Sequence, residues 1–400
     1  MNIHEYQAKK ILSQYDINIP KGGIAYTSAS AKKIAEEILP RGPWMLKSQI
    51  HSGARNNGYF IEKEAGRKGG IRFVDSKKEL VKECEKMLGK TLVTIQTGPK
   101  GKIVNKIYVE AFSKVKNLFY AGMVIDRMEP AVTLLVAKTE DDDIIKVTLN
   151  NPEKILKIKL GLDKGPNVAQ VREVLNFLEL PANAFKNLKS FINGIYRAFI
   201  QYDATLIEIN PAGLTKSGEI LALDAKMSFD DAALYRHEDI QRFKDESEYI
   251  ERKIKATKYG FDYEEFDGSV GLIVNGDGIS LALIDLLKQK GINVACYLNV
   301  KGGVDKDKIA AGIKIIMTNP KVEGILINIL GGFVRCNLIA DGIVAATSEV
   351  GLNSPLVVRF EGINKEYAKE ILEKSKLPMK ISEDMQESVD KLIKIMEEND

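Results

Sequence analysis

Short apolar runs that alternate with amphipathic segments of helical period dominate the chain from about Gly268 onward. The runs, rich in Val, Ile and Leu, are "GLIVN", "NVACYL", "GILINIL" and "PLVVRF". Continuous apolar runs separated by helices indicate a parallel sheet that is covered on both faces. We therefore predict an α/β, flavodoxin-like doubly wound domain over residues 267–400, whose ligands bind where strands end and helices begin.

The first part of the chain has a less regular pattern. It predicts a helix from His4 to Tyr15, strands at "PWMLKSQ", "KIYVEAF" and "FYAGMVID", and a long loop rich in glycine and charge over residues 51–70. Strands mixed with helices in this way predict an α+β region of two subdomains over residues 1–238. The polar segment 239–266 is predicted as a helical connector between the two domains.

Composition excludes several classes of protein. The 400 residues are 44% hydrophobic, which is enough for ordinary globular domains with real cores. The 58 basic and 55 acidic residues are interspersed and leave a net charge of +3, so we expect no nucleic-acid partner. No apolar run approaches the roughly 18 residues of a membrane span, and we expect no membrane partner.

The cysteines and the start of the chain bear on its compartment. Cys84, Cys296 and Cys336 lie far apart, and an odd number without metal spacing favours a reducing environment. The opening "MNIHEYQAKKIL" is amphipathic and charged, unlike a signal peptide. We expect a cytoplasmic protein, or one of the mitochondrial matrix if the sequence is that of a processed organellar protein.

Polar residues interrupt two apolar runs within "LIEINPAGLTKSGEILALDAK". Glu208 and Asn210 alternate with isoleucines, and a turn centred on Ser217 would place Asn210 opposite Asp224. Two carboxylates and an amide on one face offer the oxygen ligands that Mg²⁺ accepts together with nucleotide phosphates. The alternative is a half-exposed hairpin whose polar residues face water.

Three further signals in the first domain suit phosphate groups. Lys47 in "WMLKSQ" is held on a strand, although strand lysines are usually solvated, and Glu110 is an acid inside the strand "KIYVEAF". The long loop offers glycines for close backbone approach and either Arg55 or Arg67 for charge, a combination that also suits a mobile flap.

Two glycine-rich turns follow strands in the second domain. "GLIVNGDGISLALIDLL" and "ILINILGGFVRCNLIADGI" both predict strand, turn and helix, with Gly331 and Gly332 opening the second helix. Free backbone N–H groups at a helix N-terminus stabilise an anion. The alternative is that these glycines only permit tight turns.

Taken in order, the motifs of this chain resemble those of succinate–CoA ligase β subunits. They are "MNIHEYQAKKIL", "QIHSGAR", "LVTIQTGPKGK", "YVEAF", "LIEINP", "LALDAKMSFDDAALYRHEDI", "VNGDG" and "NILGGFVRCNLIADGI". The resemblance runs from the first residue nearly to the last. It implies an ATP-grasp nucleotide-binding region followed by a CoA-ligase domain of flavodoxin type.

The resemblance also implies roles for individual residues. It assigns nucleotide binding to Lys47, Ala54, Arg55, Asn56, Glu110 and Ser113, and magnesium binding to Asn210 and Asp224. Glu208 matches an acid that positions a histidine during phosphoryl transfer. The segment that meets the carboxylate substrate is matched by Asn275, Gly332, Phe333 and Val334.

The implied reaction needs a second chain. In this family an α subunit carries the phosphorylated histidine and the CoA site, the nucleotide substrate is ATP or ADP with Mg²⁺, and a dicarboxylic acid of the citric acid cycle is the other substrate. The phosphoryl group passes from ATP to the histidine and then to the acid, and the CoA thiol displaces it. None of the three histidines, His4, His51 and His237, lies in the glycine-rich turns, in agreement with a nucleophile on the partner.

The nucleotide region departs from the family pattern. Ala54 and Asn56 stand where glycines are usual, and the loop is longer, so Arg55 and Arg67 compete for the place that faces the phosphates. Leu118 replaces an acid near the ribose.

The second domain departs from the pattern too. Asp277 stands where a small residue is usual, and Asn299 and Lys301 stand where Asp and Gly are expected. Asp277 beside an anion site should be unfavourable unless Lys301 pairs with it.

These departures keep other functions open. One is a malate–CoA ligase β subunit, since "HSGAR", "QTGPKGK" and "DAKMSFDDAAL" resemble that branch as closely. Another is a paralogue that pairs with the α subunit but binds nucleotide weakly. A single-subunit ATP-grasp carboxylate–amine ligase would need no flavodoxin-like half.

The choice of nucleotide is a separate question. Pro20 resembles the residue of the ATP-using members of the family rather than that of the GTP-using ones.

Overall fold

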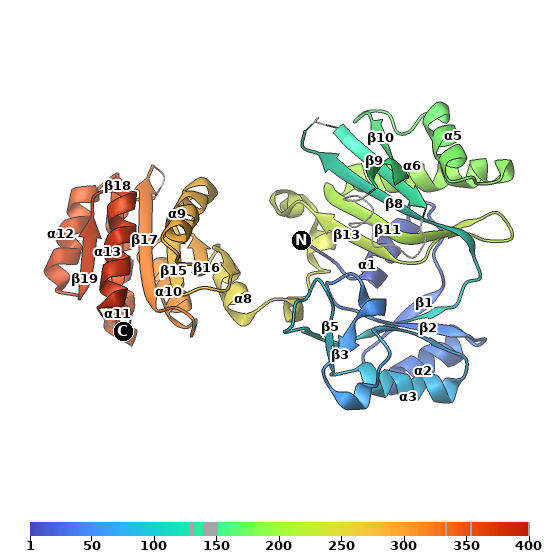
Figure 1. The fold of residues 1–400 in the computed structure, drawn as a ribbon, viewed down its shortest axis with the longest axis horizontal. Helices are drawn as coiled ribbons and strands as arrows, with labels where there is room; N and C mark the ends of the chain where they lie inside the picture. Colours follow the sequence, from blue (N-terminus) through green and yellow to red (C-terminus); the bar gives the residue numbers. More distant parts are fainter. Residues whose placement is uncertain (129–130, 139–150, 333, 353, 399–400) are drawn as a thin grey trace. The chain divides into compact units, whose positions relative to one another are not determined.

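The computed structural model of the 400-residue chain describes residues 1–128, 131–138, 151–332, 334–352 and 354–398. The chain divides into two compact units, Met1–Glu248 and Tyr249–Asp400, which Figure 1 draws from blue to yellow and from yellow to red. Each unit has apolar cores of its own. Among the described helices, none is long and apolar enough to cross a membrane.

A four-stranded antiparallel sheet organises the smaller subdomain of the first unit. Its strands, in spatial order, are β1 (Gly22–Ala25), β7 (Ile107–Ala111), β2 (Trp44–Ser48) and β4 (Ile71–Val74). Helices α2 (Ser28–Glu37) and α3 (Lys77–Met87) lie side by side against this sheet (Figure 1). Trp44, Leu46 and Leu80 are among the residues of the shared core. The two strands predicted here, at "PWMLKSQ" and "KIYVEAF", are confirmed as β2 and β7.

The long loop after β2 has ordered structure of its own. It contains two short 3-10 helices, η1 (Arg55–Asn57) and η2 (Lys63–Ala65), with β3 (Tyr59–Phe60) between them. β3 pairs with β5 (Thr91–Val93), which pairs with β6 (Lys102–Ile103). The insertion is therefore anchored by a small three-stranded sheet.

A six-stranded antiparallel sheet organises the larger subdomain. Its strands are β10 (Ile155–Leu160), β9 (Ala131–Lys138), β8 (Lys116–Asp126), β11 (Ala204–Leu214) and β12 (Ile220–Ala222), and β13 (Ala225–Phe229) also pairs with β11. The helices that pack on it are α1 (Glu5–Ser13), α5 (Val168–Phe177) and α6 (Phe185–Gln201). Five further short elements lie in this unit. The internal connections contain η3 (Pro152–Lys154) and η4 (Ala182–Ala184), and the tail contains η5 (Asp231–Arg236), α7 (Glu238–Gln241) and η6 (Glu246–Glu248).

The second unit is a doubly wound sheet. Its strands are β14 (Asp262–Glu265), β15 (Val270–Val274), β16 (Val294–Asn299), β17 (Gly324–Gly331), β18 (Leu356–Gly362) and β19 (Met379–Ser382). The spatial order is β14-β16-β15-β17-β18-β19, and all neighbours are parallel except β14. Without β14, the parallel strands follow the order 2-1-3-4-5 of flavodoxin-like folds. The predicted fold is therefore confirmed.

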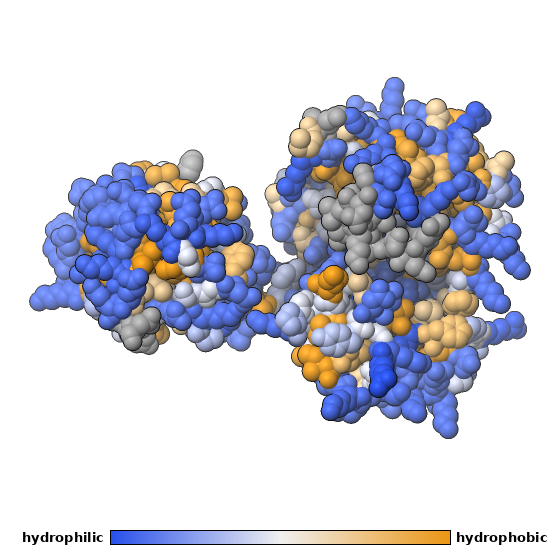
Figure 2. All heavy atoms as spheres, viewed as in Figure 1, coloured by the Kyte–Doolittle hydropathy of each residue, from blue (hydrophilic) through white to orange (hydrophobic). Residues whose placement is uncertain are grey.

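Helices cover both faces of this sheet, as the apolar runs predict. Leu272 and Val274 face α9 (Asp277–Gln289) and α13 (Met385–Glu397) in one core. Ile273 belongs to the other core, with α10 (Lys306–Met317), α11 (Cys336–Val350) and α12 (Lys365–Ser375). Hydrophilic residues cover most of the face shown in Figure 2, with apolar residues in small patches.

The prediction of a helical connector over 239–266 is wrong at its C-terminal end. α8 (Glu251–Lys258) is helical, but residues 262–265 form β14, the antiparallel edge strand of the second sheet. The segment "DYEE" has no apolar run because an edge strand is buried on fewer sides. Tyr263 is its only fully buried side chain.

Candidate functional site

The β11 hairpin places its polar residues as predicted. Ile209 lies opposite Ala225 and Ala212 lies opposite Ala222, so the register sets Asn210 across from Asp224. Residues opposite each other on antiparallel strands carry their side chains on the same face. The predicted register is therefore confirmed.

The face of the hairpin that carries the acids is partly open to solvent. Ile207 and Ile209 on β11 are fully buried, whereas Glu208 and Asn210 are half-buried. Glu208 lies opposite Gly122 on β8, and burial together with the charge of Glu208 raises the pKa of Tyr120. Glu208 and the two predicted magnesium ligands, Asn210 and Asp224, are thus all partly accessible to solvent.

Below this surface lies a cluster of buried charges that comes from both subdomains, which we call the Glu5 cluster. Its members are Glu5 and Lys9 of α1, Lys47 of β2, Arg55 of η1, Glu110 of β7 and Asp224 between β12 and β13. All except Asp224, whose side chain is 25% exposed, are buried. Three cations and three carboxylates leave the cluster formally neutral.

Lys47 and Lys9 converge on the same groups. Nζ of Lys47 lies 2.6 Å from Oε1 of Glu110, and Nζ of Lys9 lies 2.5 Å from its Oε2. Both ammonium groups also donate hydrogen bonds to the carbonyl oxygen of Leu223, at 2.5 and 2.6 Å. Because Leu223 precedes Asp224 in the chain, the two lysines lie directly beside the predicted magnesium ligand.

Arg55 is the arginine that enters the site. Its Nη2 donates to Oδ2 of Asp224 at 2.6 Å and to Oε2 of Glu5 at 2.8 Å, and its Nη1 donates to the carbonyl oxygen of Ser48 at 2.8 Å. Arg67, in contrast, is exposed. Arg55 is thus the arginine that lies beside Asp224, and which of the two faces the phosphates stays a prediction.

The backbone around Arg55 keeps a glycine-like conformation without glycine. Ala54 has φ +55 and ψ +31, in the left-handed region, which costs an alanine roughly 1 kcal/mol. Gly70 donates its N–H to the carbonyl oxygen of Arg55 at 2.7 Å, and a Cβ on Gly69 would lie 2.2 Å from the carbonyl oxygen of Asn56. Gly69 and Gly70 of the "GRKGG" segment thus pack directly against the backbone of Arg55 and Asn56.

The remaining predicted nucleotide residues are not members of the Glu5 cluster. Asn56 is exposed in η1, and Ser113 is half-buried in the turn after β7. Leu118, where an acid was expected, is exposed on β8.

Sequence reasoning missed Glu5 and Lys9. Both lie on the stripe of α1 that also carries Ala8 and Leu12, which are fully buried. This i, i+3, i+4, i+7 pattern should be apolar in a helix that packs on a core. Two opposite charges on an apolar stripe were the signal that could have found them.

The electrostatics of the cluster favour the charged forms of Glu5, Lys9 and Arg55. Burial opposes the ionisation of Glu5. The positive charges of Lys47, Lys9 and Arg55 outweigh this effect and hold the pKa of Glu5 well below its ordinary value. Burial opposes protonation of Lys9 as well, but Glu5 and Glu110 raise its pKa. Asp224 and Glu5 likewise raise the pKa of Arg55 against its burial.

The oxygen donors fit a divalent cation. The register sets Asn210 opposite Asp224, and carboxylate and amide oxygens are the hard ligands that Mg²⁺ shares with phosphate groups. Arg55 is bonded to Oδ2 of Asp224, so a cation and the guanidinium group would share or exchange this carboxylate. Asn210 and Asp224 are the residues that would hold the ion.

The predicted carboxylate site lies at the carboxyl ends of β15 and β17, the switch point of the second sheet. Asn275 follows β15, and its side chain bridges to β17 like a peptide group. Its Nδ2 donates to the carbonyl oxygen of Leu330 at 2.6 Å, and the N–H of Leu330 donates to its Oδ1 at 2.7 Å. Asn275 therefore fixes the distance between the two strand ends.

The glycine turn after β17 differs from the prediction in one respect. Gly331 is the last residue of β17, Gly332 lies in the turn, and α11 begins only at Cys336. The prediction that Gly331 and Gly332 open the helix is therefore wrong by several residues, because the chain needs a turn before it can enter α11. Phe333 lies outside the described residues.

The turn is open on the side of Gly332. Nothing lies within 4 Å of a Cβ built on it. Val334, in contrast, is 3% exposed and belongs to the apolar core. Only its backbone is left to meet a ligand.

Asp277 has found a partner other than the expected one. Lys301 pairs with Asp262 at 2.8 Å, whereas Nδ2 of Asn299 donates to Oδ1 of Asp277 at 2.9 Å. Oδ1 of Asn299 accepts the N–H of Gly276 at 2.8 Å. The two departures from the family pattern thus form one hydrogen-bonded pair at the start of α9.

A second polar cluster holds the tail of the first unit. Nε2 of His4 lies 2.7 Å from Oδ2 of Asp245, which also pairs with Lys106, and Lys102 pairs with Glu248 at 2.6 Å. His4, Asp245 and Glu248 lie close enough together to hold a metal ion. The two lysines already neutralise the two acids, so the cluster serves to fasten the tail.

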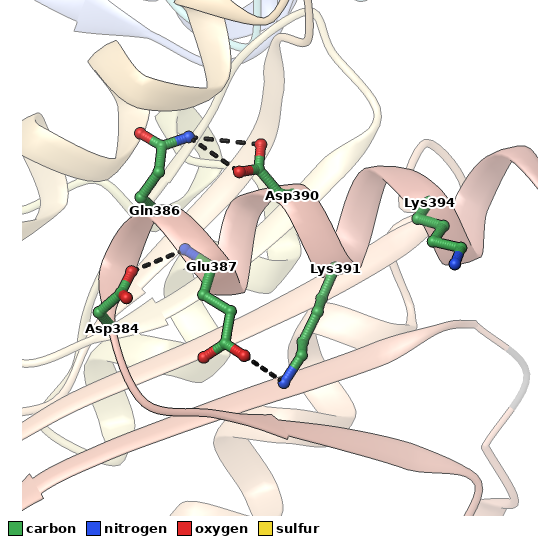
Figure 3. Close-up of a pocket in the computed structure, with 6 residues that line it drawn as sticks. All are labelled: Asp384, Gln386, Glu387, Asp390, Lys391 and Lys394. Atoms are coloured by element: carbon green, nitrogen blue, oxygen red, sulfur yellow. Dashed lines mark hydrogen bonds and ion pairs between the residues drawn. The ribbon is translucent and has the colours of Figure 1, made fainter.

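The outer surface of α13 carries a shallow hollow (Figure 3). Oδ1 of Asp384 accepts the N–H of Glu387 at 2.7 Å, and Lys391 pairs with Glu387 at 2.7 Å. These are ordinary helix-capping and i, i+4 interactions. None of the predicted site residues that the structure describes lines this hollow.

Comparisons with known proteins agree with the two units. Residues 2–214 match the ATP-grasp domain family, and residues 273–393 match the CoA-ligase family. The ADP-forming succinate–CoA ligase β subunit of Acidiphilium cryptum is 41% identical over 398 residues, 100% of both chains. That of Rhodopseudomonas palustris BisB18 is 42% identical over 399 residues, again 100% of both chains.

This chain belongs to the family of ADP-forming succinate–CoA ligase β subunits. The family resemblance of the motifs is therefore confirmed. The fold recurs in an ATP citrate lyase from Methanothrix soehngenii, solved in complex with citrate and coenzyme A, with a TM-score of 0.73 and 17% identity over 98% of this chain and 99% of that one. The order of an ATP-grasp region followed by a CoA-ligase domain, predicted from the sequence, is that of the family.

Proposed function

We propose that this chain is the β subunit of a ligase that couples ATP, or ADP and phosphate, to the interconversion of succinate and succinyl-CoA in the citric acid cycle. Membership of the ligase family supports the overall reaction. The observation that carries the proposal is the Glu5 cluster, in which Lys47 and Arg55 lie beside Asp224. Two cations next to a carboxylate suit a triphosphate bound with a divalent ion.

Each residue of the first unit would have a limited task. Lys47 and Arg55 would bind the phosphates, with Ala54 and Asn56 contributing the loop, and Glu110 and Ser113 would lie near the nucleotide. Asn210 and Asp224 would hold Mg²⁺, which neutralises the charge of the β- and γ-phosphates. These residues position the γ-phosphate for transfer.

The reacting groups would come mainly from outside this chain. The bond between the γ-phosphorus and its bridging oxygen breaks as a histidine nitrogen of the α subunit attacks, and ADP leaves. A carboxylate oxygen of succinate then takes the phosphoryl group, and the CoA thiol attacks the acyl phosphate and releases phosphate. Glu208 would position the partner's histidine, and the turns with Asn275, Gly332, Phe333 and Val334 would hold the carboxylate.

The histidines of this chain support a nucleophile on the partner. His4 is buried against Asp245, and His237 lies 2.6 Å from Oδ2 of Asp203. Burial lowers the pKa of His51 to about 3. Each of the three is engaged within the first unit, and none belongs to the glycine-rich turns of the second. We place the enzyme in the cytoplasm, or in the mitochondrial matrix if it is a processed organellar protein.

A malate–CoA ligase β subunit is the second candidate. Asp277 adds a hydrogen-bond acceptor at the carboxyl edge of the second sheet, held by Asn299, and such a group suits a substrate hydroxyl.

The test is thioester formation by this chain reconstituted with its α subunit, across a panel of dicarboxylic acids. We expect succinyl-CoA to form with the highest kcat/KM, and ATP to label the α-subunit histidine. Preference for malate would favour the second candidate. Failure of ATP to label the histidine would show a paralogue that pairs with α without supplying nucleotide.

A further inference from the structure

Glu5 is the hub of the Glu5 cluster, although no prediction placed it there. Its side chain is 2% exposed. Oε1 lies 2.9 Å from Nζ of Lys9 and 2.9 Å from Nζ of Lys47, and Oε2 lies 2.8 Å from Nη2 of Arg55. It is the one carboxylate of the cluster that contacts all three cations.

Each of the other two acids of the cluster contacts only some of the three cations. Glu110 contacts Lys9 and Lys47, and Asp224 contacts Arg55. Glu5 therefore connects the strand lysine to the loop arginine, which lie on separate segments of the smaller subdomain. α1, which carries Glu5, packs on the larger sheet.

The geometry points to Glu5 as a positioning residue for phosphoryl transfer: its carboxylate holds Lys47 and Arg55 in the orientation that the nucleotide phosphates require. This inference rests on the proposed function, because it assigns the phosphates to the same site. Glu5 is too deeply buried to meet the nucleotide, and it acts through the two cations.

Two physical arguments support this role. Hydrogen bonds from a cationic side chain to a carboxylate are charge-assisted and therefore strong, and each such bond restricts a long, flexible side chain. A misplacement of about 1 Å at a reacting centre can cost on the order of 100-fold in rate. When Asp224 turns to a bound cation, Glu5 remains as the anion that keeps Arg55 in the site.

The test compares four versions of the αβ complex: wild type, Glu5→Gln, Glu5→Asp and Glu83→Gln. Glu83 is the matched control, since it is also buried and paired with an arginine, Arg72 at 2.7 Å, but lies on α3, outside the Glu5 cluster. Three quantities are measured: the affinity for ADP with Mg²⁺ by calorimetry, the rate of α-subunit phosphorylation at saturating ATP, and the melting temperature from Trp44 fluorescence.

We expect Glu5→Gln to lower the phosphorylation rate at saturating ATP at least tenfold while the affinity for ADP changes less than threefold. The amide keeps the volume and the cations, so binding persists, but the charge that orients Lys47 and Arg55 is gone. Glu5→Asp, which keeps the charge on a shorter stem, should recover part of the rate. Glu83→Gln should lower the melting temperature and leave the rate unchanged.

Wild-type rates in a folded Glu5→Gln complex would overturn the inference, and so would a loss of ADP affinity that accounts for the whole effect. If Glu5→Gln does not fold, Glu5→Asp decides: a rate at least threefold below wild type supports the inference, and a wild-type rate overturns it. The proposed function fails on a different result, the absence of phosphorylation in the wild type.

Crystal structures of wild type and the folded Glu5 variant make the test independent of catalysis. Displacement of the Lys47 or Arg55 side chain from its wild-type position is expected. Unchanged positions of both side chains would overturn the positioning role whatever the enzyme does.

Discussion

The two units of this chain use different chemical groups at their predicted sites for anionic ligands. In the first, six charged side chains from five separate segments gather below the predicted nucleotide site, and their charges cancel. In the second, the predicted carboxylate site consists of two turns joined by the amide of Asn275. A buried cluster must be complete to be stable, because an unpaired buried charge costs about 3–5 kcal/mol.

This difference has a consequence for ligand exchange. In the Glu5 cluster, a cation that binds Asp224 would share or displace Arg55, which is then available to phosphates. In the second unit, the N–H of Gly276 donates to Oδ1 of Asn299 and the N–H of Gly332 donates to the carbonyl oxygen of Leu330 at 2.9 Å, so uncharged hydrogen bonds hold both turns. We therefore expect side chains to rearrange at the predicted nucleotide site, whereas the predicted carboxylate site stays rigid.

Asp224→Ala gives the largest expected effect on this comparison. It removes the predicted metal ligand and one of the two acids that hold Arg55. We expect ATP-driven phosphorylation of the α subunit to fall by at least about 100-fold, in line with loss of transition-state charge stabilisation. Radiolabel transfer from ATP measures it.

Assembly with the α subunit should survive this change, as checked by size-exclusion chromatography. Asp231→Ala is the control, because Asp231 is 81% exposed and pairs with the chain terminus of the same unit. If Asp224→Ala abolishes assembly, Asp224 has a structural role, and the exchange with Arg55 loses its basis.

The adjacent glycines Gly331 and Gly332 sharpen the description of the second site. A Cβ on Gly331 would lie 2.8 Å from the carbonyl oxygen of Val334 and 2.9 Å from Sγ of Cys336, whereas Gly332 has open space. We expect Gly331→Val to destabilise the second unit by about 1–3 kcal/mol, as overpacking does. Gly332→Val should keep the stability and slow thioester formation about tenfold, because the added side chain would obstruct the open turn of the predicted carboxylate site.

Urea unfolding and thioester assays separate the two outcomes. Phosphorylation of the α subunit by ATP, which depends on the first unit, should stay normal in Gly332→Val. Equal turnover of Gly332→Val and wild type would remove Gly332 from the carboxylate site.

The same contrast explains what the sequence could predict. The four apolar runs of the second unit and the register of Asn210 against Asp224 follow from periodicities of neighbouring residues, and both are confirmed. Glu5 and Lys9 could not be placed in this way. Lys9 meets Glu110 across 101 positions of sequence, and only the packing of α1 brings them together.

Two errors have local physical causes. β14 was missed because its four residues are mainly polar, as an edge strand allows. The start of α11 was set too early because glycine marks a turn but does not say how many residues the turn needs. The roles assigned to individual site residues remain predictions.

Two buried histidines predict different acid sensitivity of the two units, since His4 and His51 both lie in the first. Burial lowers the pKa of His51 from 6.5 to about 3, and burial also lowers that of His4. Below pH 6.5 the unfolded chain takes up protons that the folded unit refuses, so its stability falls as the pH drops towards 3. His51 contributes a slope that approaches about 1.4 kcal/mol per pH unit between these two pKa values.

Trp44, the single tryptophan, reports the unfolding of the first unit. Its urea midpoint should fall between pH 6 and pH 4.5, and His51→Gln should reduce the slope. A Trp44→Phe, Tyr297→Trp variant reports the second unit, whose midpoint should change less. Parallel slopes for the two probes would contradict the burial of the two histidines as neutral groups.

The smallest expected effect concerns the pair of Asp277 and Asn299. Asp277 lies in the first turn of α9, where a negative charge is favourable by roughly 0.3–1 kcal/mol, but the same charge repels a carboxylate substrate. Asp277→Ala should therefore destabilise the second unit slightly and lower the KM for succinate about two- to fivefold, since a screened like charge is worth less than about 1 kcal/mol. Raising the salt concentration should shrink the difference in KM. If KM rises instead for malate alone, Asp277 accepts a hydrogen bond from the substrate hydroxyl, and the second unit, like the first, uses a charged side chain for recognition.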